Sequence, residues 1–244
     1  MFLTVLLAGA TAPPAGAQKG GDLQAQILYG FQTEDANQLG NLMQMLGAAV
    51  KTAPADDGLR YHLAHADYRY ARISSAQHPH EAEAALQDCV DQLTAVLSHD
   101  AKSVEALALD SVCYSELARY RTLQAGLLRL RAKDRLETAY KLAPRNPRVN
   151  LLLAQGAIEN SQPGTPEYNQ AFAQLSLASQ LFDQSSATND EVPGWGHAEA
   201  YLALGRELQR RGDILGARNS IEKALIAAPD FKAAQRQLLA LEKQ

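Results

Sequence analysis

Aromatic and β-branched residues are scarce in this chain of 244 residues. Phe, Trp and Tyr together make up 6% of it, and Val and Ile are few beside Ala, Leu, Gln, Glu and Arg. Sheets are built mainly from β-branched and aromatic side chains, whereas the residues that dominate here favour helices. The composition therefore argues against an all-β or a dinucleotide-binding α/β fold, and it favours an all-α protein.

An excess of charge of one sign is also absent. The chain has 23 Lys and Arg against 27 Asp and Glu, a formal net charge of −4, so the totals indicate no nucleic-acid partner and no membrane-surface partner. With 46% apolar residues, it lacks the low hydrophobicity and high charge of a disordered chain. A folded domain is expected.

Recognisable catalytic motifs are missing. The sequence has no Gly-x-Ser-x-Gly elbow, no phosphate-binding glycine loop, no dinucleotide fingerprint and no EF-hand loop. We therefore expect a protein that is not an enzyme and that needs no cofactor.

Four of the six histidines fall close together, at His62, His65, His78 and His80. His62 and His65 share one helix face, and imidazoles suit zinc. The segment 80–84 begins like the His-Glu-x-x-His zinc motif, but Ala84 occupies the second histidine position. We predict ordinary surface or groove histidines; the alternative function is a metal-binding or metal-dependent hydrolytic protein that uses this cluster.

The N-terminus predicts export. Residues 2–10 are apolar and are followed by Thr-Ala-Pro-Pro-Ala-Gly-Ala, an order that resembles a secretory signal peptide over 1–17 with a flexible segment at 18–22. The apolar run is shorter than the about 20 residues that span a bilayer, and Ala10 stands where a lipid-bearing cysteine would be needed. The expectation is a bacterial periplasmic or secreted protein without a stable membrane anchor; the alternative is an apolar N-terminus that is not an export signal.

Cys89 and Cys113 are the only cysteines. Their separation of 24 positions fits neither a zinc ribbon nor a Cys-x-x-Cys redox pair. In an oxidising compartment they can form a disulfide, and otherwise they act as two small buried apolar residues.

The clearest helical pattern lies at 198–230. Two apolar stripes of helical period are separated by Gly212-Asp213, and the second stripe ends before Pro229. The stripe positions are Tyr201, Leu204, Gly205 and Leu208, then Ala217, Ile221, Ala224 and Leu225.

This segment resembles the tetratricopeptide repeat, with Tyr201 in place of the usual Trp and Leu208 in place of the usual Tyr. The resemblance implies that Gly205 and Ala217 face each other where two helices cross closely. Leu204 and Ala224 fill further signature positions, and Pro229 ends the second helix.

Weaker copies of the pattern precede it, for example Ala132, Leu136, Ala139 and Pro144. The resemblance thus implies an all-α, right-handed superhelical solenoid over 23–244 with about five antiparallel helical hairpins and a C-terminal capping helix at 231–243. We expect the hairpins at 22–52, 57–99, 103–144, 147–183 and 197–229. The polar segment at 183–196 is expected to be a loop and a hinge.

Charge is unevenly distributed along the chain. Residues 81–116 hold eight acids against Lys102, and residues 119–148 hold nine bases against Asp134 and Glu137. One interpretation is a bipolar surface that steers a charged ligand. The favoured one is two sets of helix faces that neutralise each other.

In a tetratricopeptide stack, the first helix of each hairpin lines the concave face, where the family receives a segment of another protein. The resemblance therefore implies a non-catalytic scaffold or adaptor of the bacterial envelope with a protein or peptide partner and no nucleic acid. Tyr and Arg often anchor interfaces. We expect the binding residues to be Tyr61, His65, Tyr68, Arg69, Arg148, Gln155, Arg206 and Gln209.

Overall fold

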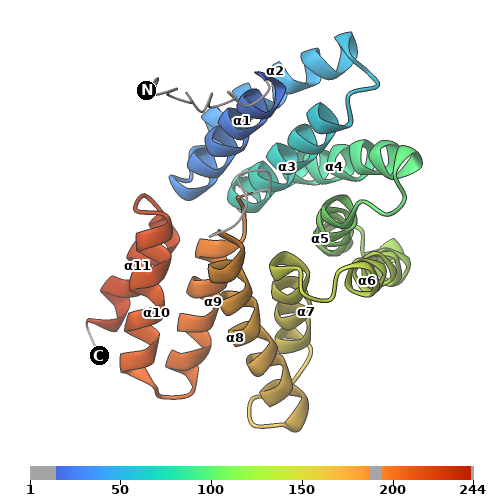
Figure 1. Ribbon diagram of the computed structural model, residues 1–244. Coiled ribbons are helices and arrows are strands. Elements are labelled where there is room, and N and C mark those ends of the chain that lie inside the picture. Colours follow the sequence, from blue (N-terminus) through green and yellow to red (C-terminus); the bar gives the residue numbers. More distant parts are fainter. Residues whose placement is uncertain (1–14, 187–193, 243–244) are drawn as a thin grey trace, which may run out of the picture.

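The chain is all-α, as predicted. The computed structural model describes residues 15–186 and 194–242, with side chains for 21–185 and 194–242. This part of the chain contains eleven α-helices, one short 3-10 turn and no strand. The helices follow one another as antiparallel hairpins (Figure 1). Their bounds are α1 Ala15–Gln32, α2 Ala36–Thr52, α3 Asp57–Ser74, α4 Pro79–His99, α5 Val104–Tyr120, η1 Thr122–Gln124, α6 Ala125–Leu142, α7 Pro147–Glu159, α8 Pro166–Ser186, α9 His197–Arg210, α10 Ile214–Ala227 and α11 Lys232–Leu241.

Local residues explain where the helices begin. Asp35, Asp56 and Asp213 cap α2, α3 and α10 by accepting a backbone N–H with their side chains. Asn146 does the same for α7. Such caps satisfy the otherwise unpaired N–H groups of a first turn. The predicted hairpin limits therefore agree with the structure to within a few residues, except at α1 and α8.

The two exceptions correct the predicted loops. Helix α1 begins at Ala15 and takes in 18–22, for which we expected a flexible segment. Helix α8 continues to Ser186, so the predicted loop at 183–196 begins later than expected. Residues 1–14 of the predicted signal peptide and residues 187–193 of the predicted hinge lie outside the described residues. Among the helices that are described, none is long and apolar enough to cross a membrane.

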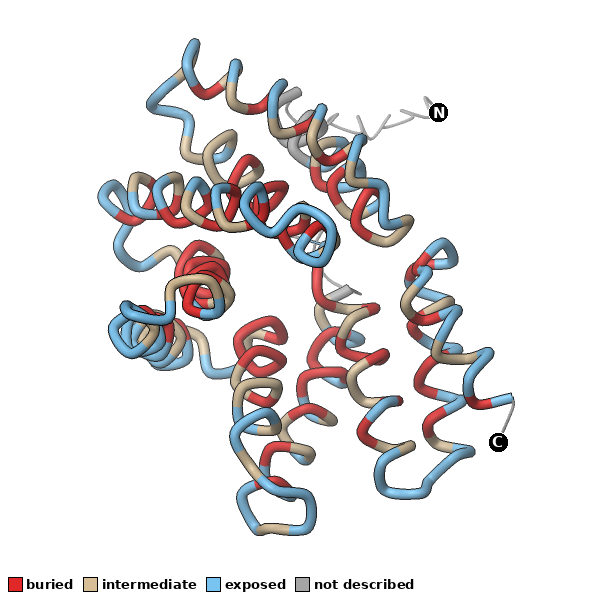
Figure 2. The backbone as a smooth tube through the Cα atoms, turned by 180° about the vertical axis from the view of Figure 1, so that it is seen from behind, coloured by how far each residue is buried: buried red, intermediate tan, exposed pale blue. Residues whose placement is uncertain are grey.

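The hairpins curve round until the last meets the first. Figure 1 shows α11 beside the end of α1. There the rings of Phe31 and Phe231 lie 5.9 Å apart between centroids, and Arg236 forms an ion pair with Glu34. Helices α3, α5, α7 and α9 are buried over much of their length, whereas α2, α6 and α10 show more exposed positions (Figure 2). The first helices of the hairpins thus form the inside of the curve.

The repeat positions near the C-terminus pack as the resemblance implies. A Cβ atom on Gly205 would lie 3.1 Å from the Ala217 carbonyl oxygen and 2.7 Å from Ile221 Cγ1. Tyr201, Ala217 and Ala224 are buried, and Leu204 is partly buried. Helix α11 covers this hairpin with Ala234 and Leu241. A glycine is needed where α9 and α10 cross.

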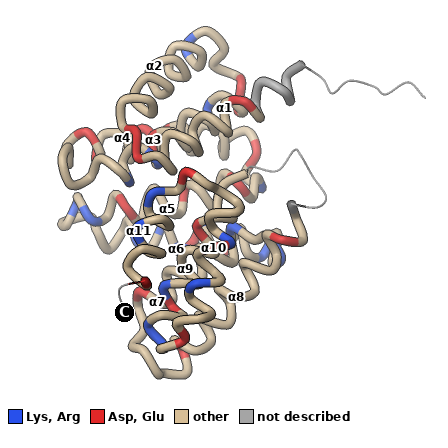
Figure 3. The backbone as a smooth tube through the Cα atoms, turned by 90° about the vertical axis from the view of Figure 1, so that its left-hand side faces the viewer, with Lys and Arg blue, Asp and Glu red and all other residues tan. Residues whose placement is uncertain are grey.

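The acidic and basic segments bind each other. Arg121 pairs with Glu83, Arg135 with Asp110 and Arg148 with Glu105. Positively and negatively charged residues are both scattered over the fold (Figure 3). Much of the charge in the two segments is therefore neutralised between neighbouring helices, in line with the favoured interpretation.

Cys89 of α4 and Cys113 of α5 form a disulfide that joins the second hairpin to the third. Both residues lie within the largest hydrophobic core cluster. The structure thus combines both expectations for these cysteines, since they form a disulfide and are also fully buried.

Candidate binding groove

Trp195 fills one end of the concave face. It is 2% exposed, and it lies in the connector between α8 and α9, two residues before α9 begins. Its indole N–H donates to the phenolic oxygen of Tyr61 on α3 at 2.9 Å, and its carbonyl oxygen accepts from Arg148 on α7. The guanidinium groups of Arg69 and Arg148 lie 5.5 and 5.7 Å from its ring. The indole is therefore held between two cations.

Gly196 lets the chain turn from Trp195 into α9. Its φ of 103° lies in the left-handed region, and an added Cβ would meet Phe182 Cζ at 2.6 Å. The Gly196 N–H donates to Glu199 Oε2 at 3.0 Å. Only glycine suits this position without strain.

The two arginines beside Trp195 are themselves paired. Arg69 binds Glu199 at the start of α9, and Arg148 binds Glu105 at the start of α5. Both arginine side chains are 2% exposed. Burial, and then the charge of Arg69, holds the pKa of His65 well below its ordinary value, so the neutral imidazole accepts from Arg69 Nε at 2.9 Å. This end of the concave face is a closed network that ties α3 to α5, α7 and α9.

Five of the predicted binding residues are buried or bonded within the protein at this end of the concave face. Tyr61, His65, Arg69 and Arg148 hold Trp195 and one another, and Tyr68 is 4% exposed. These side chains do lie on the concave face, but the protein's own connector covers four of them. Gln209 accepts a hydrogen bond from Gln237 of α11.

Beyond Trp195 the concave face is hollow. A cavity of about 1120 Å³ lies between α5, α6, α7 and α9, and a cavity of about 570 Å³ lies between the ends of α1 and α3 and helices α9 and α11. Both are lined by Arg72, Gln155, Ala203 and Arg206, where they meet. We call this joined hollow the inner groove. It contains three of the predicted binding residues: Tyr68, which is buried, Gln155, which is partly exposed, and Arg206, which is exposed.

Apolar side chains form much of the wall of the larger cavity, among them Val112, Leu136, Leu153 and Ile158. They come from α5, α6 and α7. Binding sites commonly combine such walls with a few well-placed polar groups. The inner groove has the composition of a site for a peptide with both apolar and charged side chains.

The charged groups of the inner groove are not paired evenly. Each lining glutamate forms an ion pair within the protein, through the pairs Glu34–Arg236, Glu199–Arg69, Glu116–Arg119, Glu159–Arg119, Glu137–Lys133 and Glu207–Arg210. By contrast, Arg72, Arg129 and Arg206 form no ion pair with any residue of the described chain. Arg72 donates to the Tyr68 phenol and Arg206 to the Gln237 amide oxygen. Three arginines of the lining thus have no ion-pair partner among the described residues.

Arg206 lies where these charges concentrate. Burial lowers its pKa below the ordinary value, and the positive charges of Arg72, Arg210 and Arg236 lower it further. Like charges gathered in a recess repel one another and attract an anion. The junction of the two cavities is therefore suited to a carboxylate.

The predicted metal alternative is wrong for the residues that the structure describes. They include no group of three His, Cys, Asp or Glu side chains that is able to hold a metal ion. His62 and His65 lie on α3, whereas His78 interacts with Glu81 at the start of α4. His65 already accepts from Arg69. Proximity in sequence did not bring the four imidazoles to one point.

Sequence reasoning missed Arg72 and Arg129. Arg72 lies one helical turn after Tyr68 on the same side of α3, so the spacing that selected Tyr61, His65 and Tyr68 extends to it. Arg129 belongs to α6, the second helix of its hairpin, and it also lines the larger cavity. The first residue had a periodic pattern that pointed to it, and the second had none.

Comparison with known proteins supports the fold. The sequence matches no protein-family model and no curated protein. The structure of TTC0263, a thermophilic TPR protein of Thermus thermophilus, is similar with a TM-score of 0.62 and 17% identity, covering 93% of this chain and 100% of that one. The structure of YrrB, a TPR protein with an unusual peptide-binding site, aligns with a TM-score of only 0.39 and 15% identity over 86% and 93% of the two chains. The first of these similarities establishes a tetratricopeptide-like fold; the second is too low to support a conclusion.

Proposed function

We propose that this protein is a non-catalytic scaffold that binds an acidic segment of another protein in the inner groove. Arg72 and Arg206 would pair with its carboxylates, and Gln155 would donate to or accept from its backbone. The apolar walls contributed by α5, α6 and α7 would take its nonpolar side chains. Arg129 would add a third positive charge at the rim.

The observation that carries this proposal is the pattern of ion pairs in the inner groove. Each lining carboxylate is paired within the protein, whereas Arg72, Arg129 and Arg206 are not paired by the described residues. Charge-assisted hydrogen bonds from arginine to carboxylate are stronger than neutral ones. Segments with Asp or Glu are therefore favoured over neutral or basic ones.

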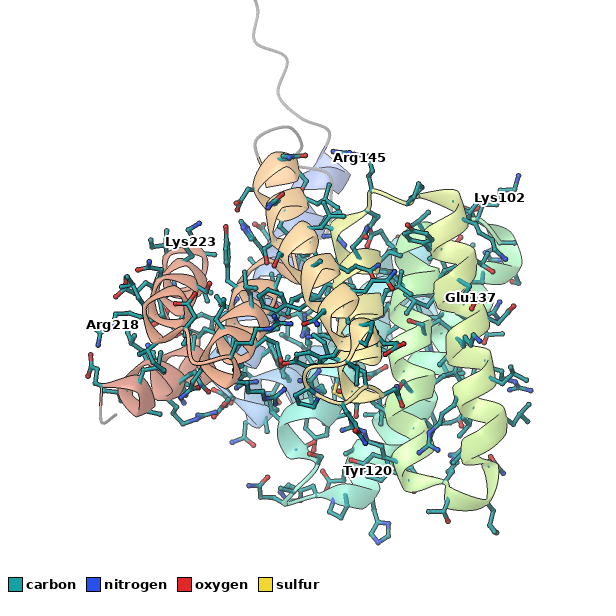
Figure 4. The ribbon with its side chains drawn as sticks, turned by 90° about the horizontal axis from the view of Figure 1, so that it is seen from below. Lys102, Tyr120, Glu137, Arg145, Arg218 and Lys223 are labelled. Carbon is teal, nitrogen blue, oxygen red and sulfur yellow. A yellow bond between two sulfur atoms is a disulfide. The ribbon has the colours of Figure 1, made fainter. Side chains whose placement is uncertain are left out.

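Fluorescence anisotropy with labelled peptides tests the proposal. An extended peptide in which Asp and Glu alternate with Leu should bind, and its Asn and Gln counterpart should bind about tenfold more weakly or worse. Arg72→Glu combined with Arg206→Glu should abolish the preference. Arg218→Glu is the matched control, because Arg218 is exposed on α10 outside the groove (Figure 4). Equal binding of the acidic and neutral peptides would contradict the proposal.

We further propose that the protein works in the periplasm or outside a bacterial cell. The signal-like residues 1–17 support this, as does the Cys89–Cys113 pair, because disulfides persist in oxidising compartments. Maleimide labelling after cell fractionation tests it. The protein should appear in the periplasmic or secreted fraction and react only after reduction. Recovery from the cytoplasm with both thiols reactive would refute the location.

A further inference from the structure

His78 lies at the wall of the inner groove, in the turn between α3 and α4. Among the described residues that line the two cavities, it is the only histidine. Its backbone is held in place, because its N–H donates to the Ser74 carbonyl oxygen at 2.8 Å and its carbonyl oxygen accepts from the Ala82 N–H at 3.0 Å. Its side chain does not cap α4, and it is 56% exposed. The imidazole therefore exchanges protons with solvent while it lines the smaller cavity.

One carboxylate lies beside this imidazole. Nδ1 of His78 is 3.5 Å from Oε1 of Glu81, and the other oxygen of Glu81 accepts from the Tyr70 hydroxyl. Glu81 forms no other ion pair with a described residue, and the Tyr70 hydroxyl carries no charge. The pair of His78 and Glu81 is thus negative when the imidazole is neutral, and protonation of the imidazole removes that net charge.

The other charged groups that line the smaller cavity keep their charge near neutral pH. Arg72 of α3 and Arg206 of α9 carry guanidinium groups, which do not lose their proton in proteins. Glu34, between α1 and α2, and Glu199 of α9 form ion pairs with arginines. The pairing of Glu34, chiefly its hydrogen bond with the arginine, holds its pKa below the ordinary value. His78 is therefore the lining side chain of this cavity whose charge responds to mild acid.

The groups around the turn from the other side do not take over this role. Tyr120 of α5 interacts with Ser75 of the turn, and burial raises its pKa above the ordinary value, so it stays neutral. Glu83 of α4 forms an ion pair with Arg121. His80 is exposed next to the turn, but it lines neither cavity.

We infer that the inner groove is sensitive to pH through His78, and that protonation of this side chain strengthens the binding of an acidic segment. The inference rests on the function proposed above. Histidine changes its charge between about pH 5 and 8, a range in which most Asp and Glu side chains of a bound segment remain ionised. Mild acid would therefore remove the repulsion between Glu81 and the segment, whereas neutral pH would restore it and favour release.

Anisotropy titrations with the acidic peptide at about pH 7.5 and about pH 5.5 test the inference. In about 20 mM salt, where screening is weak, the wild type should bind about two- to fourfold more tightly at the lower pH. His78→Gln stays neutral and should bind no more tightly in acid. His78→Lys stays charged and should bind tightly at both pH values. His80→Gln is the matched control and should follow the wild type, because His80 lines neither cavity.

Glu81→Gln provides an independent measurement. It removes the negative charge that a neutral His78 leaves uncompensated, so it should strengthen binding at about pH 7.5 by a similar factor. A His78→Gln variant that keeps the full pH effect, or a wild-type affinity that does not rise in acid, would overturn this inference and leave the proposed function standing. If the acidic peptide binds at neither pH, both proposals are wrong.

Discussion

The indole N–H of Trp195 donates to the phenolic oxygen of Tyr61 across 134 positions of sequence. This hydrogen bond joins the segment before the last hairpin to the second one, on the inside of the curve. Beside it, Arg69 forms an ion pair with Glu199 of α9. Arg148 forms an ion pair with Glu105 of α5 and donates to the Trp195 carbonyl oxygen. The closed shape of the protein depends on this small number of long-range contacts, and the predictions below begin with them.

Trp195→Ala should destabilise the protein by about 3 to 5 kcal/mol, because it leaves a cavity between two arginines and removes a hydrogen bond. Trp195→Phe keeps a ring there and should cost less, since mainly the hydrogen bond of about 1 kcal/mol is lost. Urea unfolding followed by circular dichroism measures both. Equal stability of the alanine variant and the wild type would show that Trp195 does not hold the curve together.

Arg69→Met should cost about 3 to 5 kcal/mol, because it strands the Glu199 carboxylate beside a buried network. Adding Glu199→Gln, which still accepts from the Gly196 N–H, should recover part of that loss in a double-mutant cycle. Arg236→Met removes the more exposed pair with Glu34 and should cost about 1 kcal/mol or less. Strictly additive losses for Arg69 and Glu199 would rule out their coupling.

Asp67→Asn should stabilise the protein at neutral and higher pH. Asp67 is buried, its Oδ2 has no hydrogen-bond partner, and burial followed by the charge of Asp88 raises its pKa well above the ordinary value. A carboxyl whose pKa rises on folding loses stability as the pH increases from its unfolded pKa through its folded one. The asparagine variant should therefore gain about 1 to 3 kcal/mol over the wild type at high pH and little at low pH.

Unfolding in urea at several pH values measures this difference. Asp134→Asn, an exposed substitution on α6, is the control and should follow the wild-type profile. If the Asp67→Asn and wild-type curves run parallel across the whole pH range, the carboxyl does not titrate in the way that its burial implies.

Gly205→Ala should destabilise the last hairpin by about 1 to 3 kcal/mol, because the new methyl group overlaps Ile221 Cγ1 and crowds the Ala217 carbonyl oxygen. Gly47→Ala offers a matched comparison within α2. An added Cβ there meets nothing within 4 Å, so the higher helix propensity of alanine should stabilise the protein by about 1 kcal/mol. Thermal unfolding distinguishes the opposite signs, and a stabilising Gly205→Ala would refute the close crossing.

The hairpins and their turns were predictable because their causes are local. Asp35, Asp56 and Asp213 cap helices within three residues of themselves. Apolar stripes at helical spacing and the prolines after α2, α6 and α10 mark the remaining limits. The start of α1 and the end of α8 were predicted wrongly. The small and polar residues at these two points give no apolar period and no capping signal from which a helix limit can be predicted.

The residues that line the inner groove were predicted only in part. The resemblance placed Tyr68, Gln155 and Arg206 on the inside of the curve, and all three line the inner groove. The same pattern selected Tyr61, His65, Arg69 and Arg148, which Trp195 covers. Helical period assigns a side chain to a face, but it does not say what another part of the chain will lay against that face.

The sequence alone thus determined an all-helical chain of hairpins, together with the side of each first helix that turns inward. Tertiary structure decided that α11 closes onto α1 and that Trp195 fills one end of the concave face. It also decided that Arg72, Arg129 and Arg206 line the inner groove without an ion pair to any described residue. The physical reason is range. Capping and helical period act over a few residues, whereas closure and charge pairing depend on small angles between hairpins that add up along the whole stack.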